Sequence, residues 1–389
     1  MNIFSRSKEK DELTLVFHIG SSMVGGALFV TQKSGVPKII FSVTEPIPVG
    51  EVVESNRFLS LMTKSLQIVA DKVYHAKLGA PSRIFCVLSS PWYMSQTRTI
   101  SLKKNTPFIF TAKLAEELVQ KEIKIFEEER SAKYMNMDNL FRTIELKNIK
   151  TILNGYETSQ PLNQKAKELE ITIFISTGGE QVLKKIEDTI GKYFHFKSIN
   201  FSSFAMASFT IVRDINTKGE DFLLVDIGGE ITDVFMIKKN ALCESISFPL
   251  GRNFLTRGVV AGLNCTLDEA NSFISLLKDG HAEGKFDKEV TPIINKLRSE
   301  WLLTFQKSLA DLSSDISIPS YIYVTIDKEM ADFFSETIKT EQFNQYTLAE
   351  SKFEVVFLNT VMLHGIVAFE EPVIRESSLI IDSIYINRF

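Results

Sequence analysis

Cysteine is scarce in this sequence, and the few that occur exclude two kinds of stabilising site. Cys86, Cys243 and Cys265 are odd in number and form no C-x-x-C pair. This pattern argues against a disulfide framework and against a zinc site, and it is typical of proteins from a reducing compartment. We therefore expect the three cysteines to be small core residues.

An excess of one charge and long apolar runs are also missing. The 44 basic residues nearly balance the 48 acidic residues, so the net charge is only -4, and no strong field attracts nucleic acid or an anionic membrane. No stretch approaches the ~20 apolar residues of a membrane-spanning helix, and the segment MNIFSRSKEK has no apolar core of signal-peptide length. The sequence predicts a cytoplasmic protein with no nucleic-acid partner and no direct membrane span.

The sequence does contain enough apolar material for several cores. Hydrophobic residues make up 44% of the 389 residues, which suits roughly two or three domains without covalent cross-links. Short β-branched runs alternate with stretches of helical periodicity, of which one carries Phe58, Leu61, Met62, Leu66, Val69 and Val73. This alternation predicts an α/β architecture with largely buried sheets.

Two segments at an offset of 208 residues are similar to each other. Aligning LVFHIGSSMVGGALF (15–29) with LLVDIGGEITDVFMI (223–237) matches Ile19 with Ile227 and Gly20 with Gly228. Each segment has the pattern of a strand, a glycine turn and a second strand. Such an internal repeat indicates two similar α/β halves, and two halves that face each other imply a cleft between them.

The turn within DIGGEITD (226–233) has the residue types that hold phosphate and metal. Gly228 and Gly229 leave backbone N–H groups open to phosphate oxygens, and Asp226 at the strand end can hold Mg²⁺ through water. Thr232 and Asp233 add polar groups nearby. A plain hairpin turn with solvated acids explains the motif alone equally well. The matched hairpin at 15–29 favours phosphate, because paired hairpins can hold a nucleotide's phosphates from both sides.

These motifs resemble those of the actin-like ATPase superfamily of actin, the Hsp70 chaperones and sugar kinases, and within it the bacterial branch of the division protein FtsA and the type IV pilus assembly protein PilM. DIGGEITD is similar to the second phosphate motif, and HIGSS (18–22) lies where the first belongs. FPLGRNFLTRGVVAGLNCTLDEA (248–270) is similar to the segment that follows in FtsA and PilM. The resemblance covers nearly the whole chain.

The resemblance implies a two-lobed fold of duplicated ribonuclease H-like lobes with a small inserted α+β subdomain. It implies ATP and Mg²⁺ as cofactors, with Asp226 toward the metal. The nucleotide-binding residues that it implies are Gly20, Ser21, Ser22, Asp226, Gly228, Gly229, Glu230, Thr232 and Asp233.

Four parts are expected along the chain. The first lobe comprises 1–82 and 179–213, and the second comprises 214–267 and 319–389. The insert is placed at 83–178, and a helical subdomain of the second lobe at 268–318. We expect three late apolar runs, YIYVTI, FEVVFL and SLIIDSIYI, to be strands that complete the second lobe.

Several positions depart from the superfamily pattern. The first phosphate motif normally begins with an Asp at the metal, but His18 stands there and offers no carboxylate oxygen to a hard cation. Ser202 stands where a Glu or Gln usually positions the attacking water. We interpret His18 as a hydrogen-bonded structural residue in preference to an acid–base catalyst.

The expected nucleoside contacts have changed as well. Asn271 and Ile274 replace the usual E-x-x-K pair, and Ile326 and Asp327 stand where the adenosine motif has glycines. Phosphoryl transfer depends almost wholly on positioned metal and electrostatic groups. We therefore expect ATP turnover to be absent or very slow, and we leave open residual ATP and Mg²⁺ binding at the Gly228–Gly229 turn.

The aromatic segment SPWYMSQTR (90–98) has two explanations. Trp, Tyr and Arg are enriched at binding hot spots, which would suit a partner groove at the root of the insert. Core packing explains the same residues, and we favour it. The segment LIIDSIYINRF lacks the basic face of an amphipathic membrane anchor, which favours the pilus-assembly relative over the division protein.

The leading hypothesis is an actin-like cytoplasmic scaffold of a bacterial envelope assembly machine, either a type IV pilus or the division apparatus. It would bind the cytoplasmic tail of a membrane protein at the inner face of the membrane, self-associate, and hydrolyse ATP weakly or not at all. The alternative is an active ATPase or small-molecule kinase that uses Asp226, Thr232 and Asp233. A third hypothesis is a filament former that hydrolyses nucleotide slowly.

Overall fold

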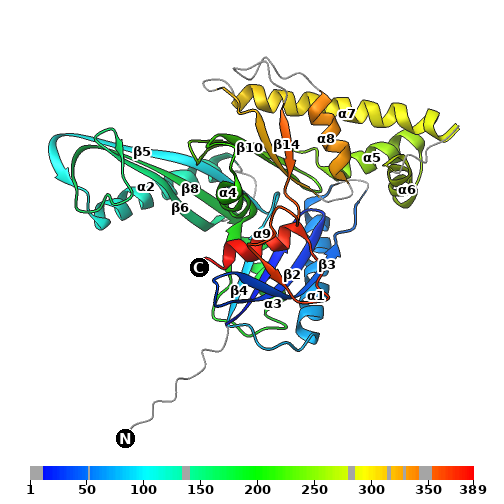
Figure 1. Ribbon diagram of the computed structural model, residues 1–389, viewed down its shortest axis with the longest axis horizontal. Helices are drawn as coiled ribbons and strands as arrows, with labels where there is room; N and C mark the ends of the chain where they lie inside the picture. The colour runs from blue at the N-terminus through cyan, green and yellow to red at the C-terminus, as the bar shows by residue number, and fades with distance from the viewer. Residues whose placement is uncertain are drawn as a thin grey trace, which may run out of the picture.

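Three β-sheets organise the chain, in a computed structural model that describes residues 12–50, 53–133, 141–278, 285–312, 317–326, 330–340 and 353–389. The strand orders are β15-β3-β2-β1-β4-β9, β12-β11-β10-β13-β14 and β5-β8-β6-β7. Figure 1 shows two lobes, with the third sheet projecting to one side and a helical arm to the other.

The first lobe is a six-stranded sheet covered by helices on both faces. Its strands are β1 (Leu13–Ile19), β2 (Met23–Thr31), β3 (Pro37–Pro46), β4 (Arg83–Leu88), β9 (Asn200–Ser203) and β15 (Ala368–Phe369), and its helices are α1 (Ser55–His75), α3 (Glu180–Ile190), α4 (Phe204–Ile215) and α9 (Ser377–Ile386). Neighbouring residues of β2 identify the two faces, because a Cβ at Gly26 would meet Val69 of α1 and one at Gly25 would meet Leu379 of α9.

The second lobe repeats the strand order of the first. Its strands are β10 (Phe222–Ile227), β11 (Thr232–Lys238), β12 (Ala241–Phe248), β13 (Tyr321–Ile326) and β14 (Glu354–Phe357). In both lobes the first strand pairs antiparallel with the second and parallel with the fourth. The two similar α/β halves predicted from the internal repeat, and the duplicated ribonuclease H-like lobes implied by the resemblance, are confirmed.

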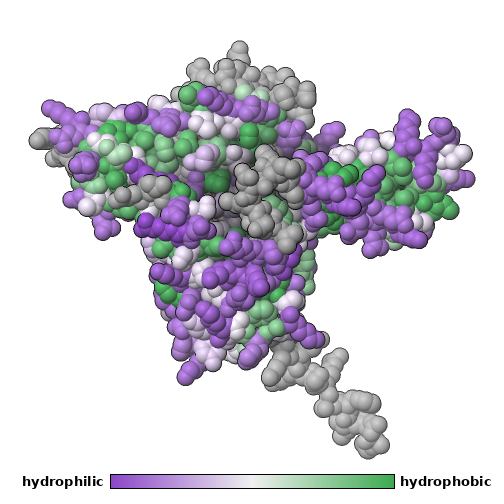
Figure 2. Space-filling view, turned by 180° about the vertical axis from the view of Figure 1, so that it is seen from behind, coloured by the Kyte–Doolittle hydropathy of each residue, from purple (hydrophilic) through white to green (hydrophobic). Residues whose placement is uncertain are grey.

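The helical arm belongs to the second lobe. It is built from α5 (Arg252–Leu263), α6 (Leu267–Lys278) and α7 (Lys285–Leu312), and α8 (Ala331–Thr340) lies nearby. Trp301 of α7 is fully buried and stacks on Phe305, with 5.2 Å between ring centroids. In Figure 2 apolar residues gather along this arm, whereas the first lobe is mostly hydrophilic. None of the described helices is long and apolar enough to cross a membrane.

The insert is an α+β unit with its own small core, as predicted. It contains β5 (Tyr93–Ile109), β6 (Phe141–Leu153), β7 (Tyr156–Glu157), β8 (Lys165–Gly179) and α2 (Ala112–Lys133). Phe126 of α2 is fully buried in the same cluster as Ile171 and Ile173 of β8. Alternate residues of β8 therefore support α2 on one face of the sheet.

The strand order differs from the expected boundaries at two places. Strand β4 was expected in the insert, but it pairs with β1 and so belongs to the first lobe. The segment after β14 was expected in the second lobe, but β15 pairs with β3. The chain thus returns to the first lobe after β14, and among the described residues β13 and β14 complete the second sheet.

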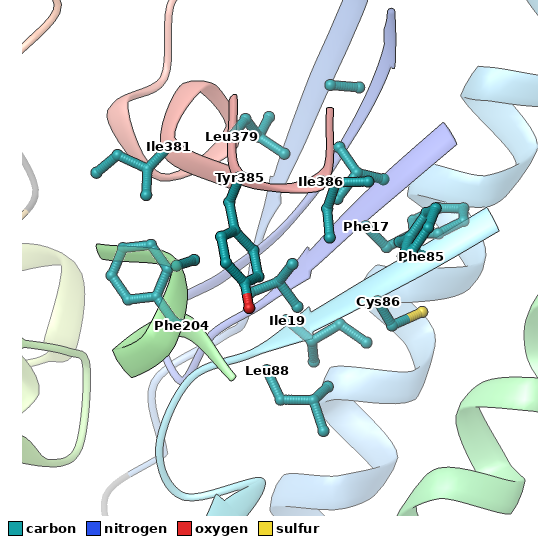
Figure 3. Packing of buried hydrophobic residues seen from close by; sticks show 14 of the residues in the cluster. Phe17, Ile19, Phe85, Cys86, Leu88, Phe204, Leu379, Ile381, Tyr385 and Ile386 are labelled. Carbon is teal, nitrogen blue, oxygen red and sulfur yellow. The ribbon is translucent and has the colours of Figure 1, made fainter. Parts of the chain in front are cut away.

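The predicted strand in SLIIDSIYI is wrong, because this segment forms helix α9. Its residues 379–386 are all buried, between the first sheet and α4 (Figure 3). A helix that is apolar on every side has no polar face, so periodicity does not separate it from a buried strand.

Candidate functional site

The two predicted phosphate turns face each other and touch directly. The backbone N–H of Glu230 donates a hydrogen bond of 3.1 Å to Ser21 Oγ. A Cβ added at Gly229 would lie only 2.7 Å from the carbonyl oxygen of Ser21. Glycine is therefore required here so that one turn can approach the backbone of the other.

Replacing Gly229 with alanine is expected to lower the free energy of unfolding by about 1–3 kcal/mol, because the new methyl group would collide with the Ser21 backbone. Urea denaturation followed by circular dichroism measures this change. Gly179→Ala is the matched control, since the nearest atom to a Cβ there is 3.9 Å away. Equal stabilities of the two variants would mean that the turns are not in contact.

The space left between the turns is small. A cavity of about 50 Å³ is bounded by the ends of β1, β4, β10 and β13 and by the start of α9. Its polar lining residues are His18, Ser21, Ser22, Ser89, Asp226, Thr325, Glu376, Ser377 and Ser378. Ligand pockets usually measure about 300–1,000 Å³, so this cavity has room for a few waters but not for a nucleotide.

The structure divides the nine predicted binding residues into two groups. Gly20, Ser21, Ser22, Asp226 and Gly228 line the cavity. Gly229, Glu230, Thr232 and Asp233 do not line it, and the last three have buried side chains. The binding role of the first group stays a prediction.

Glu230 anchors the second turn to helix α5. Its carboxylate accepts hydrogen bonds from Asn253 Nδ2 at 2.8 Å and from the guanidinium of Arg257, and the side chain is buried. The N–H groups of Arg252 and Asn253 donate to the carbonyl oxygens of Gly228 and Gly229. The backbone N–H groups at the start of α5 thus find their hydrogen-bond acceptors in the turn itself.

Thr232 is directed into the core of the second lobe. Its hydroxyl donates to the carbonyl oxygen of Leu250 at 2.8 Å, and Trp301 Nε1 donates to the same oxygen at 3.1 Å. Thr232 is fully buried. These contacts account for the presence of a threonine at this position without a role in ligand binding.

Asp233 is a buried carboxyl group beside serine hydroxyls. Ser247 donates to it, and Ser90 is a second hydrogen-bond partner. Burial raises its pKa from 3.8 to about 6, although both serine bonds act in the opposite direction. Between about pH 4 and pH 6, Asp233 therefore keeps a proton in the folded state that it releases in the unfolded chain.

This raised pKa predicts a loss of stability as the pH rises from about 4 to about 6, worth about 3 kcal/mol in total. Asp233→Asn cannot ionise, so its unfolding free energy should change much less over this interval. Denaturant titrations at several pH values measure the difference. Asp71, whose side chain is 48% exposed, provides the matched Asp→Asn control. A wild-type slope retained in Asp233→Asn would contradict the assignment.

His18 forms a buried pair with a residue from the C-terminal helix. Its Nδ1 lies 2.9 Å from Asp382 Oδ2, and the two residues are 5% and 0% exposed. Burial lowers the pKa of His18, but the charge of Asp382 and the hydrogen bond with it, together with Asp226 and Glu376, outweigh burial and raise this pKa above 6.5. The position expected to engage a metal is thus hydrogen-bonded to a carboxyl group of the protein itself, in line with the structural interpretation of His18.

Asp226, the residue predicted to face the metal, is hydrogen-bonded within the second lobe. Asp226 Oδ1 accepts a hydrogen bond of 2.6 Å from Thr325. Within the described residues, no three His, Cys, Asp or Glu side chains cluster so that they could hold a metal ion. Mg²⁺ in nucleotide sites is usually held by one or two carboxylates together with waters and substrate phosphates, so a cluster of three protein ligands is not required. The metal role of Asp226 stays a prediction.

The other departures from the superfamily pattern lie at several places in the second lobe and in β9. Ser202 is buried in β9, and Asn271 accepts a hydrogen bond of 3.1 Å from Thr256. Ile274 packs against the core of the second lobe, and Ile326 lines the cavity. Asp327 lies outside the described residues.

The aromatic residues at the root of the insert are part of the core. Trp92 Nε1 donates a hydrogen bond of 2.6 Å to the carbonyl oxygen of Gly20, and the Trp92 ring stacks on Phe58 at 4.9 Å. Trp92 and Tyr93 are both buried. Core packing, the favoured explanation of this segment, agrees with the structure.

A larger hollow of about 560 Å³ lies between α1 and α3, away from the turns. Leu59 is its only apolar lining residue; the others are Asn56, Ser60, Thr63, Lys64, Gln67, Gln181, Lys185, Asp188, Thr189 and Lys192. Ligand sites are mostly apolar with a few convergent polar groups. This hollow therefore lacks the character of a small-molecule site.

No motif or periodicity pointed to two buried acids, Asp382 and Glu145. Asp382 lies within an apolar run that was predicted to be a strand, and Glu145 within the insert. Both contacts span more than 50 residues: Glu145 Oε2 accepts from Ser203, and Asp382 pairs with His18. Only the tertiary fold brings them together.

The duplicated lobes, the facing glycine turns and the insert define the actin-like ATPase fold. The PilM–PilN type IV pilus biogenesis complex has a similar structure, with 96% of each chain covered, a TM-score of 0.58 and 13% identity. A Bacteroides thetaiotaomicron protein with an actin-like ATPase fold and unknown function matches over 98% of this chain and 99% of its own, with a TM-score of 0.44 and 8% identity. Ethanolamine utilization protein EutJ from Carboxydothermus hydrogenoformans matches over 98% and 92%, with a TM-score of 0.42 and 10% identity. No protein-family model and no curated protein matches the sequence.

Proposed function

We propose that this protein is a cytoplasmic actin-like scaffold of a bacterial envelope assembly machine, with weak or no ATP hydrolysis. The observation that carries the proposal is the direct contact between the two phosphate turns, which leaves a cavity of about 50 Å³. Phosphoryl transfer requires a bound nucleotide and positioned cations. A cleft in which the two turns are joined by the hydrogen bond from Glu230 to Ser21 suits a structural role.

The partner that we propose is the cytoplasmic tail of a membrane protein. The similar PilM–PilN structure is a complex of type IV pilus biogenesis, and a tail would bring this chain to the inner face of the membrane. Pilus assembly is the favoured setting over cell division. Self-association of the scaffold is part of the same proposal.

Two measurements on the purified full chain test the lost catalysis. Mg-ATP is titrated by calorimetry, and phosphate release is followed over hours. We expect no heat of binding and no release above the buffer rate. Saturable heat together with steady release would establish the alternative, an active ATPase or kinase. Saturable heat with ATP-dependent sedimentation would establish the filament former.

The partner is tested by titrating a synthetic tail peptide from a short membrane protein encoded beside this chain. Saturable binding of that peptide, and not of its scrambled sequence, is expected for a pilus-type scaffold. Failure of the tail peptide to bind, with binding to a tubulin-like division protein instead, would move the role to cell division.

A further inference from the structure

One side of helix α9 carries two buried polar residues that contact different parts of the molecule. Asp382 and Tyr385 are three residues apart, so they project from the same side of the helix. Asp382 pairs with His18 at the end of β1, immediately before the first phosphate turn. The Tyr385 hydroxyl donates a hydrogen bond of 2.5 Å to Glu145 Oε1 in β6 of the insert. In Figure 3 the Tyr385 ring points away from the axis of α9.

Glu145 is the junction of three elements. In addition to Tyr385, its carboxylate accepts hydrogen bonds from the N–H and the hydroxyl of Ser203, at 3.0 and 2.6 Å. Ser203 is also the N-cap of α4, where its hydroxyl accepts from the N–H of Met206. Glu145 is only 7% exposed. This buried acid therefore joins the insert to both α4 and α9.

The insert also contacts the second lobe. Thr97 of β5 donates a hydrogen bond of 3.2 Å to the carbonyl oxygen of Leu242 in β12. A shift of the insert therefore changes contacts with both lobes. At the opposite end of α9, Glu376, Ser377 and Ser378 line the cavity between the phosphate turns.

We propose that α9 couples the position of the insert to the first phosphate turn, through Tyr385 near its C-terminal end and Asp382 one turn earlier in the helix. A buried hydrogen bond that loses one partner leaves the other unsatisfied, so each contact is either made or lost and not gradually stretched. Moving the insert breaks the Tyr385–Glu145 contact, displaces the rigid helix and loosens the Asp382–His18 pair. A partner that binds the insert thereby controls the turn. This coupling goes beyond the proposed scaffold role and holds whether or not the cleft binds nucleotide.

Hydrogen exchange on the full chain tests the coupling. In Tyr385→Phe, which loses only the hydroxyl, amides of the turn at 19–23 should exchange about fivefold faster or more. Amides of β10 and β11 in the second lobe should keep their rates. Asp382→Asn should in turn speed exchange in β6 around Glu145. The matched control is Asn387→Ala, immediately after α9, which removes exposed hydrogen bonds with Thr31 and Gly35 and should change neither region.

Two results would overturn the proposal. One is an unchanged rate at 19–23 in Tyr385→Phe, and the other is an equal increase throughout the chain, which would indicate general destabilisation. Glu145→Gln serves as the second variant if Tyr385→Phe does not fold. In the double variant with Asp382→Asn, coupled residues should give a smaller effect on the turn than the product of the single effects. Multiplicative effects would show that the two contacts are independent.

Discussion

Replacing Asp382 with alanine is expected to lower the free energy of unfolding by about 3–5 kcal/mol, because it leaves the His18 imidazole buried without its partner. Both side chains are almost wholly shielded from solvent, with side-chain exposures of 6% and 0%. Glu370→Ala is the matched control, since it breaks the exposed Lys38–Glu370 pair and should cost less than about 1 kcal/mol. Chemical denaturation of the three proteins measures the difference.

A double-mutant cycle separates the pair from its surroundings. His18→Leu combined with Asp382→Ala removes both charges, and it should be less destabilised than the sum of the single variants. Additive losses would show that the two residues do not interact.

The His18–Asp382 pair also predicts the direction in which the free energy of unfolding changes with pH. The pKa of His18 is raised above 6.5 in the folded state, so its stabilising effect is complete below about pH 6.5 and is lost as the pH rises through the folded-state value. Burial also raises the pKa of Asp382, which gives the same sign. Asp382→Ala should lose this dependence, and a wild-type slope in that variant would contradict the assignment.

Replacing Glu230 with alanine is expected to lower the free energy of unfolding by about 2–4 kcal/mol. The change removes a buried acceptor from Arg257 and Asn253 and so separates the second turn from α5. We expect a smaller loss of stability than for Asp382→Ala because the Arg257 side chain is 21% exposed. Thermal and urea unfolding measure this loss.

This variant also distinguishes a structural role of Glu230 from the ligand role predicted by the sequence motif. A residue that served mainly to bind a nucleotide would leave the stability of the ligand-free protein nearly unchanged. Arg257→Ala, which removes the other side of the contact, should reproduce most of the destabilisation. Full stability of Glu230→Ala would contradict the anchoring role.

The paired hairpins could be predicted because their information is local and repeated. Ile19–Gly20 and Ile227–Gly228 occur in the same strand–turn–strand context, so the repeat identified both lobes and both turns. The hydroxyl of Ser21 lies within the first motif, yet its contact with the N–H of Glu230 depends on how closely the lobes approach. The sequence pattern of neither segment determines the distance between the two lobes.

The C-terminal helix could not be predicted for a different physical reason. Every residue of α9 from Leu379 to Ile386 is buried, so the apolar run has neither the period of a helix nor that of a half-exposed strand. Assigning it to a strand also hid Asp382, the partner of His18. The repeat made it evident that a histidine stands at position 18 in place of the usual Asp. The residue that pairs with this histidine, Asp382, lies 364 residues away.

Disulfide trapping of the two turns tests the central claim most directly, namely that they touch in the native protein. A Cβ at Gly228 would lie 3.0 Å from Ser21 Oγ, so side chains at these two positions are in direct contact, as a disulfide requires. Ser21→Cys with Gly228→Cys, in a chain with Cys243 and Cys265 replaced by serine, should cross-link on mild oxidation, and Mg-ATP should not slow the reaction. Ser21→Cys alone is the control. Failure to cross-link would mean that the cleft is open. Protection of both thiols by Mg-ATP would mean that the cleft holds nucleotide.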